Sequence, residues 1–127
     1  MILYSVYMNR VVYNKLVRDT IPDRIRESGG DYEVRVLAGD EFKNELIKKV
    51  SEEAAELQGL VSNREELIKE MGDLLDVLDE LQKEFKITNA ELLVARETSY
   101  KKKGGFEKKL FLHWTSDAGY KNDSDVK

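Results

Sequence analysis

The spacing of apolar and polar positions from residue 40 onward predicts three long helices. The first runs over residues 40–60 and has an aspartate at its start as the N-cap. The other two run over residues 62–85 and 88–104. Each of them opens on a serine or threonine followed three residues later by glutamate, which is the capping-box pattern. A Gly-Gly pair ends the third helix.

Shorter patterns lie outside these helices. Pro22 suits the first turn of a short helix that ends before Gly29-Gly30. Residues 32–37 alternate with valines and are predicted as a strand, and residues 106–114 are predicted as a second strand that pairs with it. The predicted fold is mainly α, an antiparallel helical bundle with a short two-stranded β element.

The same patterns predict how the chain is divided. Residues 1–12 form an N-terminal extension or a short strand, and either Met1 or Met8 could be the start. Residues 13–114 form one domain, because one proline in the whole chain leaves no Pro-rich linker. The polar tail, residues 115–127, is predicted to be disordered.

Composition narrows the function classes. The 127 residues carry a net charge of -4, which argues against broad, sequence-independent nucleic-acid binding. Cysteine is absent and His113 is the one histidine, so thiolate chemistry and a histidine-based zinc site are excluded. No apolar run is long enough for a bilayer and no signal peptide is recognised, so no membrane partner is expected and a cytoplasmic location is predicted.

Two groups of carboxylates carry the main indication of function. Glu52, Glu53 and Glu56 lie near the end of the first long helix, and Glu70 and Asp73 lie on the second. Acids three residues apart lie one turn apart on one side of a helix. Converging carboxylates without a cation would repel, and a hard divalent ion such as Mg²⁺ neutralises them. Such a site suits chemistry on phosphate.

The helical wheel distinguishes the five acids. Glu53 falls inside the apolar stripe formed by Leu46, Val50, Ala54 and Leu57. Glu56 lies at the border of that stripe, and Glu52 points further out. On the second helix the stripe contains Leu67, Met71, Leu74, Leu78 and Leu81, with Glu70 at its border and Asp73 toward the polar side. The alternative is an acid-rich bundle in which one buried glutamate pairs with a lysine or arginine.

Glu-Glu-x-x-Glu followed by Glu-x-x-Asp on the next helix resembles the MazG-like all-α nucleoside triphosphate pyrophosphohydrolases. Residues 13–22, which read YNKLVRDTIP, and residues 103–106, KGGF, resemble the phosphoribosyl-ATP pyrophosphohydrolase-like branch of that group. The resemblance spans residues 13–114.

The resemblance implies roles for particular residues. Glu53, Glu56, Glu70 and Asp73 correspond to the ligands of Mg²⁺, which Mn²⁺ could replace. Glu52 would orient water, and Glu52 or Glu53 would accept its proton. Lys15, Arg18, Lys101 and Lys103 are the candidates for binding the substrate's phosphates.

The function expected on this basis is metal-dependent hydrolysis of a nucleoside triphosphate to a monophosphate and pyrophosphate, in the manner of nucleotide-pool house-cleaning. Two alternatives remain open. One is a phosphoribosyl-ATP pyrophosphohydrolase of histidine biosynthesis, and the other is a non-catalytic helical interaction module. Related enzymes are oligomers, so a homodimer or homotetramer is expected.

Overall fold

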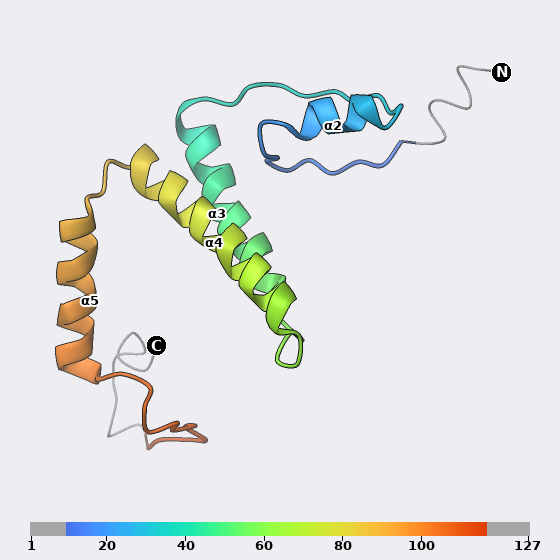
Figure 1. Cartoon of the computed structure of the whole chain (residues 1–127). Coiled ribbons are helices and arrows are strands. Elements are labelled where there is room, and N and C mark those ends of the chain that lie inside the picture. Colours follow the sequence, from blue (N-terminus) through green and yellow to red (C-terminus); the bar gives the residue numbers. More distant parts are fainter. Residues whose placement is uncertain (1–9, 117–127) are drawn as a thin grey trace. The chain divides into compact units, whose positions relative to one another are not determined.

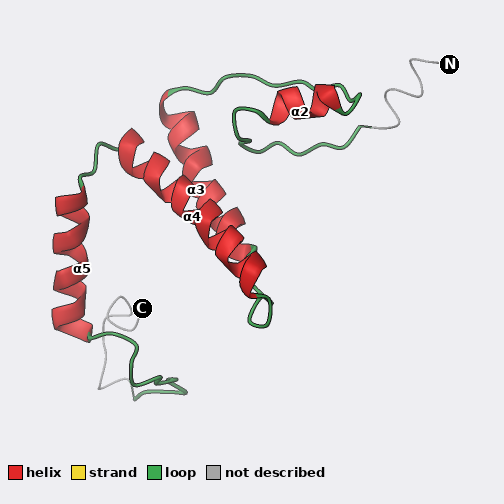
Figure 2. Cartoon of the chain, viewed as in Figure 1, coloured by secondary structure: helices red, strands yellow, loops and turns green. Residues whose placement is uncertain are grey.

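The regular structure of residues 10–116 is entirely helical (Figure 1 and Figure 2). The computed structural model describes residues 10–116, which form four helices: α2 (Ile21–Glu27), α3 (Gly39–Ala55), α4 (Arg64–Glu84) and α5 (Asn89–Lys103). The predicted mainly-α class is therefore confirmed. Most of the predicted N-terminal extension and of the predicted C-terminal tail lies outside the described residues.

The two segments predicted as a β pair are irregular. Neither residues 32–37 nor residues 106–114 form a strand, and no other part of residues 10–116 does. A strand needs a partner that accepts and donates its backbone hydrogen bonds. Residues 32–37 belong to the compact unit Met1–Lys86, and residues 106–114 belong to the unit Ile87–Lys127. Neither segment therefore has the other as a pairing partner inside its own unit. Alternation alone does not supply a partner.

In the first unit, α3 and α4 form a helical hairpin (Figure 1). Helix α3 ends at Ala55, several residues before the predicted end at Leu60, and Glu56 is its C-cap. Beyond it the chain makes tight turns, in which the backbone N–H groups of Leu57 and Gln58 donate to the carbonyls three residues before them. Gly59 has a φ of 80°, which favours glycine and lets the chain reverse.

The caps of the helices follow the sequence closely. Thr88 and Glu91 form the predicted capping box: Glu91 N–H donates to Thr88 Oγ1 at 3.1 Å, and Thr88 N–H donates to Glu91 Oε2 at 2.7 Å. At α4 the N-cap is Asn63 rather than the predicted Ser62, and Asn63 Oδ1 accepts from Glu66 N–H. Asparagine is at least as good a cap as serine, so the helix starts one residue later than expected.

Burial in the hairpin differs in part from the predicted stripes. Leu46 on α3 is 4% exposed and is the one buried apolar residue of the described chain. On α4 the buried residue is Glu70, at 8%, whereas Met71 and Leu78 of the predicted stripe are 49% and 40% exposed. The covered face of α4 therefore keeps Leu67, Leu74 and Leu81 of the predicted stripe but has Glu70 and Val77 in place of Met71 and Leu78, a rotation of about 50°. Its half-buried members are Leu67, Asp73, Leu74, Val77 and Leu81.

Beside the covered face, α4 has a second apolar stripe that is exposed. Ile68, Met71, Leu75 and Leu78 follow the three-and-four spacing of a helix face, and each is at least 40% exposed. Among residues 10–116, no helix has both the length and the apolar character that crossing a membrane requires.

Candidate metal centre

The hairpin brings three of the four predicted metal ligands together. One carboxylate oxygen from each of Glu53, Glu70 and Asp73 lies within 4.8 Å of the other two. Glu53 comes from the last turn of α3, whereas Glu70 and Asp73 lie one turn apart on α4. Oxygen ligands at adjacent positions around Mg²⁺ are roughly 2.9 Å apart and opposite ones roughly 4.2 Å, so the three oxygens would approach one another by up to about 2 Å to hold the ion. Carboxylate oxygens are the donors that a hard divalent cation prefers.

The three carboxylates already have cationic neighbours. Lys49 Nζ lies 3.6 Å from Glu53 Oε1, and Lys69 Nζ lies 3.0 Å from Glu70 Oε1. Lys69 also lies 3.6 Å from Asp73 Oδ2. Its hydrogen bond to Glu70 is the main reason why the pKa of Lys69 is raised above its ordinary value. The repulsion expected of an unpaired acidic group is thus relieved within the chain, as the ion-pairing alternative predicts.

Arg18 adds a third cation from a distant part of the sequence. Its Nη2 donates to Asp73 Oδ1 at 2.9 Å and to Asp76 Oδ2 at 2.8 Å. The hydrogen bond to Asp76 is the main reason why the pKa of Arg18 is raised. Because a guanidinium is charged at any physiological pH, the rise changes nothing in its protonation there. The contact places one residue of the predicted phosphate-binding set directly beside the metal ligands.

Glu56 does not join the three clustered acids. It is the C-cap of α3 and is exposed, whereas Glu53 is half-buried and Glu70 is buried. Glu52 is closer to the centre through Lys49, whose Nζ lies 3.5 Å from Glu52 Oε2. That oxygen is buried and accepts no hydrogen bond from any described residue.

The remaining predicted substrate-binding residues lie elsewhere. Lys15 Nζ sits over the ring of Tyr13, 5.4 Å from its centroid. Lys101 and Lys103 belong to the last turn of α5, in the second unit. The structure therefore brings Arg18 alone, of the four predicted phosphate-binding residues, into contact with the carboxylates within the first unit.

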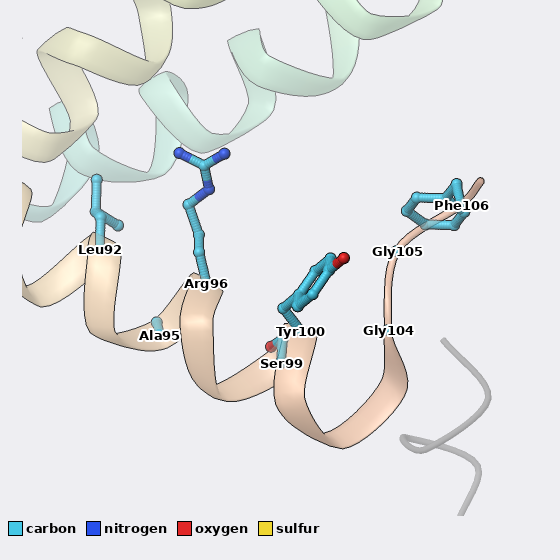
Figure 3. A pocket seen from close by; sticks show the side chains of 8 residues that line it. All are labelled: Leu92, Ala95, Arg96, Ser99, Tyr100, Gly104, Gly105 and Phe106. Carbon is cyan, nitrogen blue, oxygen red and sulfur yellow. The ribbon is translucent and has the colours of Figure 1, made fainter.

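The second unit carries an apolar hollow of its own along α5 (Figure 3). Its volume is about 410 Å³, and Tyr100, Phe106 and Arg96 are among the residues that line it. A Cβ on Gly105 would come within 3.1 Å of the Tyr100 ring and 2.7 Å of Glu107 Oε2, so a larger residue there would crowd the ring and displace the glutamate side chain. None of the clustered carboxylates lines the hollow.

Sequence reasoning missed Lys49, Lys69 and the role of Asp76. The two lysines could have been found, because Lys49 precedes Glu53, and Lys69 precedes Asp73, by the four residues that bring side chains together on a helix. No such local signal connects Arg18 with Asp76, because the two residues are 58 positions apart in the sequence.

No family model matches the chain, and neither a curated protein nor a solved structure does.

Proposed function

We propose that the chain binds Mg²⁺ or Mn²⁺ through Glu53, Glu70 and Asp73 and hydrolyses a nucleoside triphosphate to its monophosphate and pyrophosphate. The observation that supports this most directly is the convergence of three carboxylate oxygens from two helices within 4.8 Å, one of them on the buried Glu70. Burying a carboxylate is unfavourable unless it is paired or coordinates a metal. Glu70 is already paired with Lys69, so the convergence of the three oxygens, rather than the burial of one carboxylate, is what supports a metal site.

The bound ion would supply positive charge to the phosphate oxygens as negative charge develops on them. The residues of the chain have separate tasks. Glu52 Oε2, buried and without a hydrogen-bond donor among the described residues, would hold the attacking water and accept its proton. Lys49 Nζ, which lies 3.5 Å from Glu52 Oε2 and 3.6 Å from Glu53 Oε1, would hold the two carboxylates side by side.

The resemblance of residues 13–22 and of the two acidic helices to MazG-like pyrophosphohydrolases supports the choice of substrate class. Arg18 belongs to residues 13–22 and donates a hydrogen bond to Asp73, which is one of the three clustered carboxylates. This position is the one expected of a residue that binds the substrate's phosphates next to the metal. The physiological substrate would be a canonical or modified nucleotide, or phosphoribosyl-ATP. The chemistry at the carboxylates is common to all of these.

The test is pyrophosphate release from a panel of canonical and modified triphosphates and phosphoribosyl-ATP, with Mg²⁺ and with EDTA. Asp73→Asn should lower turnover by at least about 100-fold, as losing a charge-stabilising group at an active site does. Asp79→Asn, an exposed aspartate of the same helix, is the matched control and should change turnover less than about twofold. If no member of the panel is cleaved, or if Asp73→Asn remains active, the proposal is wrong.

A non-catalytic interaction module is the second candidate, because the clustered acids already have basic neighbours. In that case the ion pairs would be purely structural, and Mg²⁺ would not raise the unfolding temperature. Under the enzymatic proposal, Mg²⁺ in excess of its dissociation constant should stabilise the folded chain measurably.

The exposed stripe of α4 (Ile68, Met71, Leu75 and Leu78) supports a further part of the proposal, self-association as a homodimer or homotetramer. A helix that covers one apolar face and leaves a second one open is typical of a bundle completed by another helix. Gly72 borders the stripe, and a Cβ placed on it would meet nothing within 4 Å. A second helix could therefore approach α4 closely at this position.

A further inference from the structure

Arg18 holds the irregular segment before α2 onto α4. The segment makes few apolar contacts of its own, since Val11, Val12 and Tyr13 are each more than two-thirds exposed. The segment is joined to α4 by two ion pairs, from the Arg18 guanidinium to Asp73 and to Asp76. The position of the segment relative to α4 therefore depends on whether these two ion pairs persist when a metal binds.

The two aspartates are unequal partners. Asp73 belongs to the three clustered carboxylates, whereas Asp76 does not. The side chains of Arg18 and Asp73 are 57% and 30% exposed, and an ion pair that is open to water on the arginine side contributes little to stability. A divalent ion at Asp73 would carry twice the charge of a guanidinium and gain Glu53 and Glu70 as further ligands. The ion would therefore displace the Arg18 guanidinium from Asp73.

The guanidinium keeps unused donors in the described structure. Both of its hydrogen bonds come from Nη2, whereas Nη1 and Nε donate to no acceptor of residues 10–116. An arginine offers five N–H donors in a planar fork that matches phosphate oxygens. If Asp76 alone retains Nη2, the rest of the fork remains beside the carboxylates and is available to an anion.

We propose that Asp76 is a positioning residue: when a divalent metal takes Asp73, Asp76 keeps Arg18 beside the metal ligands, where its free N–H groups bind a phosphate group of the substrate. This rests on the proposed function and adds to it a residue outside the metal-binding set. Arg18 then has two states. In the metal-free protein it neutralises Asp73, and in the loaded protein it neutralises phosphate.

The first test uses Mn²⁺ alone, measured by its paramagnetic resonance signal in the full chain. Arg18→Gln removes the competitor for Asp73 and should tighten Mn²⁺ binding by about two- to fivefold, as expected for the loss of an exposed ion pair. Arg35→Gln is the matched control, since Arg35 also pairs with a carboxylate but on Glu41. An unchanged or weaker affinity in Arg18→Gln would overturn the exchange.

The second test uses the Mg²⁺ complex of inorganic triphosphate, measured by calorimetry, because this probe has no base or sugar. Asp76→Asn should weaken its binding by about tenfold while Mn²⁺ affinity changes less than about twofold. In steady-state kinetics the same variant should raise KM and leave kcat nearly unchanged, and Asp76→Glu should recover part of the loss. Asp79→Asn is the control. Equal binding in Asp76→Asn and wild type would refute the role of Asp76.

The outcomes separate this inference from the proposed function. If the wild type binds no Mn²⁺, both are wrong. If Mn²⁺ binds and pyrophosphate is released, but Arg18→Gln and Asp76→Asn behave like their controls, the inference alone fails. Both residues are more than half exposed, so the variants are expected to fold.

Discussion

Arg18 and Asp73 are separated by 55 positions in the chain and are joined by a hydrogen-bonded ion pair of 2.9 Å. The pair connects the irregular segment before α2 with the middle of α4. It also combines a residue expected to bind phosphate with one expected to bind metal. Its consequence is that the two tasks share one location within the first unit of the chain.

Glu70 should show a trade-off between stability and metal binding. Replacing it by leucine removes a buried charge and leaves Lys69, which is 62% exposed, in water. Glu70→Leu should therefore raise the free energy of unfolding of the metal-free protein by about 1 kcal/mol, since buried ion pairs are often less stable than apolar replacements. Mn²⁺ affinity should fall at least tenfold. Urea unfolding and Mn²⁺ titration measure the two effects, and unchanged Mn²⁺ binding would exclude Glu70 as a ligand.

Leu46 should be the most sensitive apolar position of the hairpin. It is 4% exposed, so Leu46→Ala loses buried area and leaves a cavity between α3 and α4. The expected loss in the free energy of unfolding is about 2–3 kcal/mol. The control is Val61→Ala, at a position 96% exposed, which should change it by less than about 0.5 kcal/mol. Urea denaturation followed by circular dichroism compares the two, and equal losses would mean that the packing is different.

The ion pair between Arg35 and Glu41 predicts a pH dependence. Two hydrogen bonds from the guanidinium hold the pKa of Glu41 below its ordinary value of 4.5. Because the pKa is lower in the folded state, the pair stabilises the fold above about pH 4.5 and loses this effect as the pH falls through the folded-state pKa. The difference in urea midpoint between wild type and Glu41→Gln should therefore be larger at pH 7 than at pH 3. The opposite trend would contradict the assignment.

The capping box of α5 should be worth about 1 kcal/mol. Thr88→Ala removes the acceptor for Glu91 N–H and should destabilise the helix by roughly that amount. Thr98→Ala in the same helix is a matched control, because Thr98 Oγ1 only donates back to the Val94 carbonyl four residues earlier. That substitution should be neutral or slightly stabilising. Thermal unfolding of the two variants in parallel gives the comparison.

Leu75 tests the self-association proposed for the open stripe of α4. It is 57% exposed, so Leu75→Glu should leave the α3–α4 hairpin folded. The charge would prevent an apolar helix from packing on the stripe, and the molecular mass from light scattering should fall to that of the 14.7 kDa monomer. Val61→Glu is the control for added charge. A wild type that is already monomeric would exclude the oligomer.

Features that depend on residues close together in the sequence were predicted better than features that depend on distant residues. The capping box of Thr88 and the stop at Gly104 involve residues within one or two turns, so local rules were sufficient. The α3–α4 hairpin followed from the helical periodicity and the short connection between the helices. The predicted β pair failed because its two segments lie in different units, which no local pattern reveals.

The candidate site follows the same division between local and long-range interactions. Glu53, Glu70 and Asp73 were all expected and do converge, because helix spacing fixes two of them and the hairpin adds the third. Glu56 was expected to join them but is exposed at the C-cap of α3, and the burial of Glu70 depended on which face of α4 meets α3. The pairing of Arg18 with Asp76 is a long-range contact, so no spacing rule could have predicted it.

The position of the three acids on one hairpin has a consequence for the order of folding. The turn around Gly59 closes over a few residues, and contacts between neighbours in sequence form faster than distant ones. Glu53, Glu70 and Asp73 would thus meet as soon as α3 and α4 zip together, whereas Arg18 must close a far longer loop. A nascent chain could hold its first divalent ion before the N-terminal segment has docked, and the ion would then act as a template for folding.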